Sequence, residues 1–222
     1  MFPIRDSHSS GKFPFINISL IGANLYIFIK ELFSPDIEIF IAQYALIPAN
    51  IDITRFETLT PFITSMFLHA GFLHIFSNMW FLWIFGDNVE ARLGHIKYFT
   101  FYITCGVVAS FIQYLFIASQ SLPMLGASGA IAGILGAYFV FFPRHSIDTL
   151  VPIFGFPTIV AIPAYFILIY WFITQAFSGV ATVFATTASI GGVAYLAHAG
   201  GFSTGWFLAS TFLAKKVPNV LK

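Results

Sequence analysis

The sequence is short of charge and of cysteine. Of its 222 residues, 9% are charged and 58% are hydrophobic, whereas about 25% of the residues in an average soluble domain are charged. A soluble protein with so few charges would expose large apolar patches and aggregate, so the composition indicates a protein whose solvent is lipid. The formal net charge of +1 gives no reason to expect nucleic acid as a partner. Cys105 is the only cysteine, which excludes an internal disulfide and a cysteine-based zinc site.

Long apolar runs fill most of the chain. A helix needs about 20 apolar residues to cross a bilayer, and six candidate spans lie between polar or turn-forming breaks. They are residues 13–33, 71–87, 97–119, 124–142, 156–177 and 188–214. The first span lacks the small-residue cleavage site of a signal peptide, so we expect it to be retained. Pro157 and Pro163 are expected to bend the fifth span.

The expected fold class is therefore all-α, a polytopic membrane protein built as a bundle of six transmembrane helices. We expect a short cytoplasmic N-terminal segment over residues 1–12, a membrane domain over 13–214 and a short basic cytoplasmic tail over 215–222. No separate soluble domain is expected at this length and composition.

The placement of lysine and arginine predicts the orientation. With six spans, the two termini and the turns after the second and fourth spans share one side of the membrane. Most basic residues fall in those places: Arg5, Lys12, Arg92, Lys97, Arg144, Lys215, Lys216 and Lys222. By the positive-inside rule, both termini are expected to be cytoplasmic. Residues 34–70 then lie outside, and their mixture of acidic and large apolar side chains suits a segment half-embedded in the outer interface.

Four polar residues stand out inside the apolar spans. His74 and Asn78 lie four apart near the start of the second span and so share one helix face. Ser128 lies near the start of the fourth span, and His198 lies in the sixth. The even-numbered spans run inwards from the outer side, so a rise of about 1.5 Å per residue puts all four in the outer part of the membrane. Such groups are costly in lipid and usually face the bundle or a wet cavity.

Small residues recur every four positions on the fourth and sixth spans. Such stripes let two helix backbones approach closely. If the two stripes face each other, Ser128 and His198 adjoin the contact. The residues of the two stripes are Gly129, Gly133 and Ala137 on the fourth span and Ala197, Gly201, Gly205 and Ala209 on the sixth; Gly126 is a further candidate for close helix packing.

A serine beside a histidine is the minimum machinery for acyl transfer, because the histidine removes the proton of the hydroxyl group. The developing oxyanion needs hydrogen-bond donors, for which His74, Asn78 and the backbone N–H of Ser128 are candidates. Taken singly, each residue has a structural alternative. Ser128 could serve only to pack two helices together, and His198 could donate a hydrogen bond to a neighbouring carbonyl. His74 and Asn78 could form hydrogen bonds between two helices. Their coincidence at one depth favours a catalytic site.

At these residues the sequence resembles the rhomboid intramembrane serine proteases. Residues 74–78 fit the family's H-x-x-x-N helix, residues 126–129 fit G-x-S-G, and residues 197–205 fit A-H-x-x-G-x-x-x-G. The resemblance implies that Ser128 is the nucleophile and that His198 is the general base and acid, without a carboxylate partner. It implies that His74, Asn78 and the Ser128 amide form the oxyanion hole. It also implies that the fifth helix and residues 178–189 act as substrate gate and cap.

Some positions depart from the family pattern. Leu59-Thr60-Pro61 stands where many members carry a Trp-Arg pair in the first outer loop. Ala132 stands where some members have a tyrosine that stacks on the catalytic histidine, so either Tyr195 supports His198 instead or the imidazole is held less firmly. His69 matches a frequent family histidine, and we expect it to have a structural or water-organising role.

The predicted function is an intramembrane serine endopeptidase that cleaves transmembrane segments of membrane proteins near the outer face, in a prokaryotic inner (plasma) membrane. Its expected partners are those protein substrates and the lipid bilayer, with no nucleic acid, metal or other cofactor. One alternative is a non-catalytic rhomboid-like protein that binds transmembrane clients. Another is a small transporter, which should carry acidic residues at mid-membrane or an inverted repeat. A metalloprotease is disfavoured because H-E-x-x-H does not occur.

Overall fold

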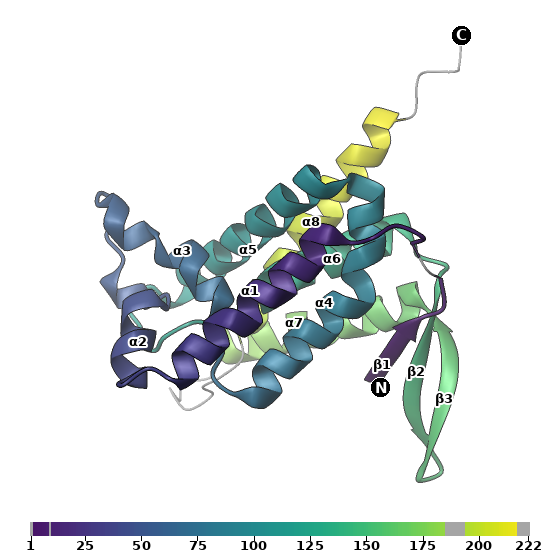
Figure 1. The fold of residues 1–222 in the computed structure, drawn as a ribbon, viewed down its shortest axis with the longest axis horizontal. Helices are drawn as coiled ribbons and strands as arrows, with labels where there is room; N and C mark the ends of the chain where they lie inside the picture. Colours follow the sequence, from purple (N-terminus) through teal and green to yellow (C-terminus); the bar gives the residue numbers. More distant parts are fainter. Residues whose placement is uncertain (1, 9, 185–193, 217–222) are drawn as a thin grey trace.

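The computed structural model describes residues 2–8, 10–184 and 194–216. Six long helices form a bundle (Figure 1): α1 Phe15–Leu32, α4 Phe72–Leu93, α5 His95–Ile117, α6 Ser128–Phe141, α7 Ala164–Phe184 and α8 Tyr195–Lys216. The connection between α1 and α4 holds the short helices α2 Ile37–Tyr44 and α3 Pro61–Thr64 and three 3₁₀ turns, Pro48–Asn50, Phe56–Leu59 and Ser65–Phe67. Beside the bundle lies a three-stranded sheet of β1 Phe2–Asp6, β2 Ser146–Ile153 and β3 Phe156–Pro163.

This sheet corrects the expectation of an all-α fold. β2 pairs antiparallel with both β1 and β3, and Phe154 and Gly155 form the turn between β2 and β3, each with a positive φ. Positive φ at both central residues is the geometry of a tight hairpin turn that matches the strand twist. Hydropathy alone does not distinguish such an apolar, β-branched run from a helix. The fifth span therefore begins at Ala164, and Pro157 and Pro163 lie in edge strand β3, where a missing N–H is tolerated.

The break predicted between the second and third spans lies later than the charged stretch, because α4 continues without interruption to Leu93. The charged side chain of Glu90, in the last turns of this helix, finds hydrogen-bond partners in other parts of the chain. The buried Glu90 carboxylate accepts the backbone N–H groups of Ile16 and Asn17 at 2.9 and 2.7 Å, and it contacts the ring of His95. Glu90 thus provides acceptors for the N–H groups that the start of α1 leaves unpaired. The chain turns instead at Gly94, whose φ is 84°.

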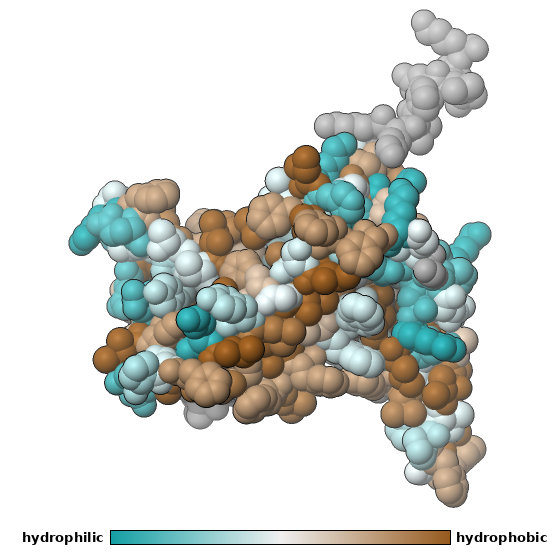
Figure 2. Space-filling model, viewed as in Figure 1, coloured by the Kyte–Doolittle hydropathy of each residue, from teal (hydrophilic) through white to brown (hydrophobic). Residues whose placement is uncertain are grey.

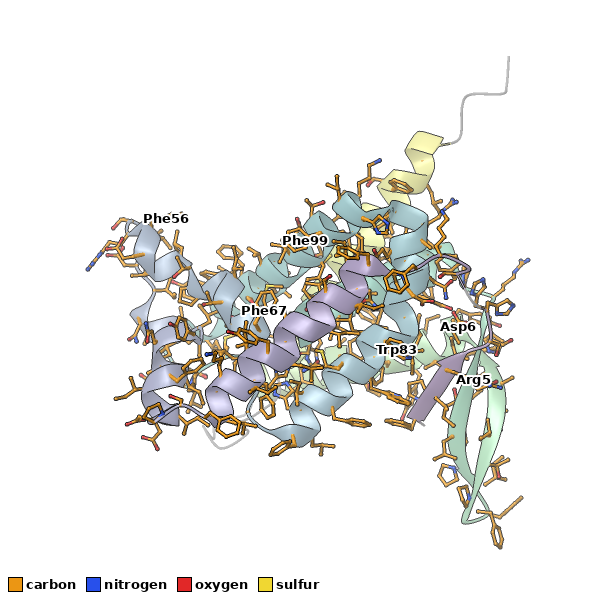
Figure 3. All side chains as sticks on the ribbon, in the orientation of Figure 1. Arg5, Asp6, Phe56, Phe67, Trp83 and Phe99 are labelled. Carbon is orange, nitrogen blue, oxygen red and sulfur yellow. The ribbon has the colours of Figure 1, made fainter. Side chains whose placement is uncertain are left out.

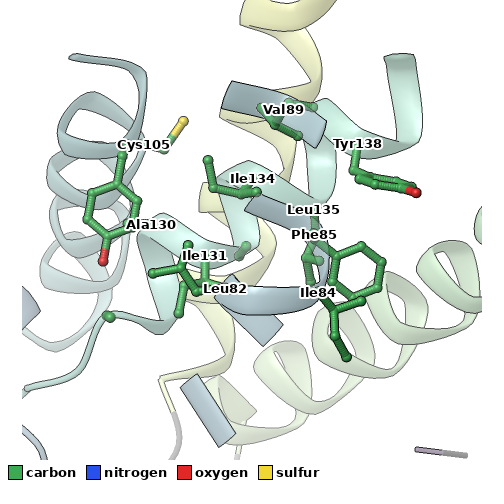
Figure 4. Packing of buried hydrophobic residues seen from close by; sticks show 14 of the residues in the cluster. Leu82, Ile84, Phe85, Val89, Cys105, Ala130, Ile131, Ile134, Leu135 and Tyr138 are labelled. Carbon is green, nitrogen blue, oxygen red and sulfur yellow. The ribbon is translucent and has the colours of Figure 1, made fainter. Parts of the chain in front are cut away.

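The helix α6 lies at the centre of the bundle. Every residue from Ala130 to Tyr138 is buried, and Figure 4 shows side chains of α4 and Cys105 of α5 packed around it. A Cβ added at Gly201 would overlap the carbonyl oxygen of Gly129, and one at Gly205 would overlap that of Gly133. The two glycine stripes therefore face each other, and they bring the backbones of α6 and α8 into direct contact.

The surface of the bundle is apolar around its middle (Figure 2), with polar residues gathered toward its ends. Large side chains such as Trp83, Phe99, Leu115 and Phe166 are exposed on the helices of the bundle, as expected for surfaces that face lipid rather than water. Among the described residues, α1, α5 and residues 164–181 of α7 are long and apolar enough to span a membrane. A fourth span is possible if residues 56–67 and α4, which meet at an 81° bend, count as one.

Part of the predicted topology lies outside the described residues. The predicted gate and cap, residues 178–189, falls on α7 as far as Phe184, and its remainder is not described. The same holds for residues 188–193 of the sixth predicted span and for residues 217–222 of the C-terminal tail.

Candidate active site

The predicted site residues meet at one end of the bundle. His74 is in the first turn of α4, Ser128 is the first residue of α6, and His198 is in the first turn of α8. They line a cavity of about 1010 Å³ together with Asn78 and with Trp171 of α7. Three helices that start at the same end of the bundle thus deliver their polar residues to one depth.

The structure places Ser128 and His198 in hydrogen-bonding contact. Ser128 Oγ lies 2.7 Å from His198 Nε2, and His198 Nδ1 lies 2.7 Å from Gln175 Oε1. Since the amide oxygen of Gln175 can only accept, Nδ1 carries the ring proton, and Nε2 is left to accept the proton of the serine hydroxyl. This tautomer, inferred from the hydrogen bonds, is the one that general-base catalysis requires.

Two side chains of α7 hold His198, and neither was predicted from the sequence. Gln175 accepts from Nδ1, and the Trp171 ring lies 5.8 Å from the imidazole, measured between centroids, with a 31° tilt. Within the described residues, the side-chain contacts that hold His198 thus come from Ser128 and α7 rather than from Tyr195. The sequence held one indication of this support, a glutamine within an apolar span and a tryptophan four residues before it. Positions four apart share a helix face, so the two side chains could have been expected to act together.

A second group of donors faces the cavity from α4. Asn78 is 6% exposed, and its Nδ2 makes no hydrogen bond within the described residues. His74 Nδ1 accepts the backbone N–H of Ala70 at 3.4 Å, which assigns the ring proton to Nε2. A Cβ at Gly126 would lie 2.8 Å from that Nε2 and 3.8 Å from Asn78 Nδ2. Both donors therefore border the loop that leads into Ser128.

That loop is fixed by backbone pairing. Leu46 and Met124 exchange N–H···O bonds of 3.0 and 2.8 Å, and the N–H of Gly126 donates to the carbonyl of Ser65 at 2.9 Å. Gly126 has a φ of 121°, a backbone conformation that glycine adopts without strain. Ser128 then begins α6, where the first N–H groups of a helix have no intrahelical acceptor and carry a partial positive charge. The start of α6 can thus stabilise a negative charge that develops beside Ser128.

His69 packs against one of these donors, His74. It is 1% exposed, its ring packs edge-to-face on His74 at a centroid distance of 5.1 Å, and its backbone N–H donates to Glu31 at 3.1 Å. The ring lies beside the cavity wall, where it can orient the imidazole of His74. Ala132, at the position of the family's stacking tyrosine, is fully buried below Ser128 on α6.

Comparison with known proteins gives three informative relatives. Presenilin-associated rhomboid-like protein A, mitochondrial, of Danio rerio is 31% identical over 99 residues, which are 43% of this chain and 26% of the relative. RHOMBOID-like protein 6, mitochondrial, of Arabidopsis thaliana is 40% identical over 75 residues, 34% of this chain and 24% of the relative. Rhomboid protein 1, mitochondrial, of Saccharomyces cerevisiae is 31% identical over 134 residues, 58% and 37% respectively.

These matches span from about a quarter to just over a third of the relatives' own lengths. A family model, the Rhomboid domain, matches residues 57–215, which include the described part of the cavity from His74 to His198. On the sequence motifs, the helical membrane fold and this match, the chain belongs to the rhomboid family.

Proposed function

We propose that this chain is an intramembrane serine endopeptidase that cleaves transmembrane segments of other proteins near the outer face of the membrane. The observation that carries the proposal is the 2.7 Å contact between Ser128 Oγ and His198 Nε2 at the wall of a cavity. In that contact the histidine is positioned to activate the serine, and activation is what a serine hydroxyl needs to act as a nucleophile. Membership of the rhomboid family supports the proposal.

In the proposed reaction, Ser128 Oγ attacks the scissile carbonyl carbon while its proton passes to His198 Nε2. The carbonyl oxygen becomes an oxyanion, for which Asn78 Nδ2, His74 Nε2 and the backbone N–H of Ser128 are the proposed donors. His198 then gives its proton to the leaving amine, and the peptide bond breaks to leave an acyl enzyme on Ser128. Water, activated by His198 in the same way, releases the acyl group and restores the serine.

We further propose that α1, α4, α5, α6, α7 and α8 all cross the membrane, with both termini cytoplasmic. The basic residues around the far end of the bundle support this orientation, since Lys12 Nζ donates to the carbonyl of Ala91 there, at the end of α4 away from His74. With its 14 residues, α6 is about 21 Å long, shorter than the roughly 30 Å hydrocarbon core. A helix that ends at the cytoplasmic face therefore starts below the outer surface, and so does Ser128.

The proposed substrate is a membrane-spanning helix that unwinds locally in the cavity, because proteolysis needs an extended backbone with accessible carbonyls. The proposed entry is past α7, and residues 178–189 would cover the site. The relatives named above are mitochondrial by name, so the prokaryotic plasma membrane expected from the sequence stays a prediction.

The test uses the purified chain in detergent and in proteoliposomes. The wild type should react covalently with a fluorophosphonate probe and should cleave a single-span model substrate, whereas Ser128→Ala should do neither. His198→Ala should lose nearly all turnover. Equal cleavage by wild type and Ser128→Ala would refute the assignment, and a folded wild type that binds the substrate without cutting it would favour the non-catalytic alternative.

A further inference from the structure

A second cluster of chemically active side chains lies on the sheet side of the bundle, away from the cavity. Asp6 ends β1, His8 follows it, and His145 lies between α6 and β2; Figure 3 labels Asp6 on its strand. One ligand atom of each of the three lies within 4.8 Å of those of the other two. Among the described residues, no other three such side chains lie as close together. The rings of His8 and His145 are stacked, with centroids 4.2 Å apart.

The two imidazole nitrogens lie too far from the Asp6 carboxylate for direct hydrogen bonds to it. His8 Nδ1 lies 3.6 Å from Asp6 Oδ1, and His145 Nδ1 lies 3.5 Å from Asp6 Oδ2. Both distances exceed the 2.7–3.2 Å that is usual for an N–H···O bond. In a tetrahedral zinc site with bonds of about 2.0–2.1 Å, neighbouring ligand atoms are roughly 3.3 Å apart. The two observed spacings, which run to different oxygens of the Asp6 carboxylate, are slightly longer than that value.

The carboxylate at the centre of the cluster is held by its neighbours. The side chain of Asp6 is 6% exposed, and its Oδ2 accepts hydrogen bonds from Asn88 Nδ2 at 2.7 Å and from the hydroxyl of Tyr138. Asn88 Nδ2 also donates to the carbonyl of His8 at 3.0 Å, and the N–H of His8 donates to Asp6 Oδ1 at 2.8 Å. Such outer partners orient the ligands of metal sites and keep them in place.

The second histidine is equally well fixed. The N–H of His145 donates to the carbonyl of Phe142 at 3.1 Å, and its carbonyl accepts the N–H of Ala164 at 2.8 Å. Nδ1 of the His145 ring also lies 3.2 Å from the hydroxyl of Tyr138. His8, in contrast, has a half-exposed side chain, so it can adjust when an ion arrives.

We propose that Asp6, His8 and His145 form a binding site for a zinc-like divalent transition-metal ion, with water in the remaining coordination position. Two imidazole nitrogens and one carboxylate oxygen are ligands that zinc prefers, whereas magnesium and calcium take oxygen ligands almost alone. The ion would connect the N-terminal strand to the turn between α6 and β2 and, through His145, to the start of α7. It would therefore fasten the N-terminal segment to the base of the helix that carries Gln175.

The test titrates Zn²⁺ into the full chain, purified without a polyhistidine tag and freed of metal with a chelator. Isothermal calorimetry should find one Zn²⁺ per chain, with no comparable signal from Mg²⁺. Removing an outer-shell partner typically weakens metal binding 10- to 100-fold. We therefore expect about that loss for Asn88→Ala, and about 100-fold or more for His8→Ala and for His145→Ala. Co²⁺ should give the visible spectrum of a tetrahedral site in the wild type and lose it in His8→Ala.

His95→Ala is the matched control, because His95 is also a partly exposed histidine beside a carboxylate, that of Glu90. It should bind Zn²⁺ as the wild type does. Zinc at 100 times its dissociation constant should raise the ratio of folded to unfolded wild type about 100-fold, and the same zinc concentration should raise it no more than about twofold in His8→Ala. Absence of stoichiometric binding, unchanged affinity in His8→Ala and His145→Ala, or loss of binding in His95→Ala would each overturn the proposal. Protease activity of the chain is not needed for any of these readouts.

Discussion

Gln175 offers the sharpest test of how the proposed dyad is assembled. Its Oε1 lies 2.7 Å from His198 Nδ1, and it belongs to α7 rather than to the helices that carry the family motifs. When His198 takes the serine proton, the imidazole becomes cationic, so the hydrogen bond to Gln175 changes from neutral to charge-assisted. A hydrogen bond to a charged group contributes about 1.5–3 kcal/mol and a neutral one about 1 kcal/mol, so the transition state gains about 0.5–2 kcal/mol from this change.

We therefore expect Gln175→Leu, which keeps the size of the side chain but cannot accept a hydrogen bond, to lower kcat roughly 2- to 30-fold, since each 1.36 kcal/mol is tenfold in rate. Gln175→Glu restores an acceptor at the same place and should recover most of the activity. The assay is cleavage of a single-span substrate in proteoliposomes, together with the rate of fluorophosphonate labelling, which reports on Ser128 without substrate entry.

Gln43→Leu is the matched control, because Gln43 is an exposed glutamine on α2 and should leave both rates unchanged. Thermal unfolding in detergent separates loss of catalysis from loss of fold. If Gln175→Leu stays folded and keeps kcat within twofold of the wild type, or if Gln175→Glu is as slow as Gln175→Leu, then Gln175 does not position His198.

Three further predictions follow from particular contacts. Asn78→Ala should lower kcat by about 10²–10³, the usual effect of losing one oxyanion donor, with little change in KM; an unchanged kcat would remove Asn78 from the proposed oxyanion hole. Gly205→Ala should destabilise the fold by about 1–3 kcal/mol or more in detergent unfolding, because the added Cβ meets the carbonyl oxygen of Gly133. A Cβ at Gly22 on α1 would meet nothing within 4 Å, so Gly22→Ala should be neutral or slightly stabilising. Glu90→Ala should lower the free energy of unfolding by about 2–5 kcal/mol, because it removes the acceptor of the N–H groups of Ile16 and Asn17. Glu38 is exposed on α2, so Glu38→Ala should leave the free energy of unfolding almost unchanged. Equal losses in the two variants would contradict the role of Glu90.

The class of the protein could be predicted from the sequence, because the free energy of transfer into a membrane depends on each residue separately. Low charge and long apolar runs require a lipid environment whatever the fold, and the H-x-x-x-N and A-H-x-x-G-x-x-x-G spacings depend only on the local periodicity of a helix. For that reason the four-residue spacing of His74 and Asn78 was enough to predict that they share one helix face. The glycine stripes indicated the close approach of the fourth and sixth helices in the same way.

The same local reasoning failed where hydrogen-bond partners come from distant segments. The apolar run 156–163 read as the start of a helix, but pairing with β2 satisfies its backbone. The charged stretch 87–92 read as a break, but Glu90 and Asn88 find partners at the N-terminal end of the chain, so α4 continues through it.

Two arrangements were decided by the tertiary structure alone. Gln175 meets His198 across 23 positions of sequence, and His145 meets Asp6 across 139, the difference between their residue numbers. Neither pair lies within one helix or one motif, so no periodicity relates its members. The sequence alone thus determined that the protein is a membrane-embedded rhomboid with a serine and a histidine at one depth. Helix packing determined which side chain supports the histidine, and strand pairing brought Asp6, His8 and His145 together, because such contacts exist only after the chain has closed on itself.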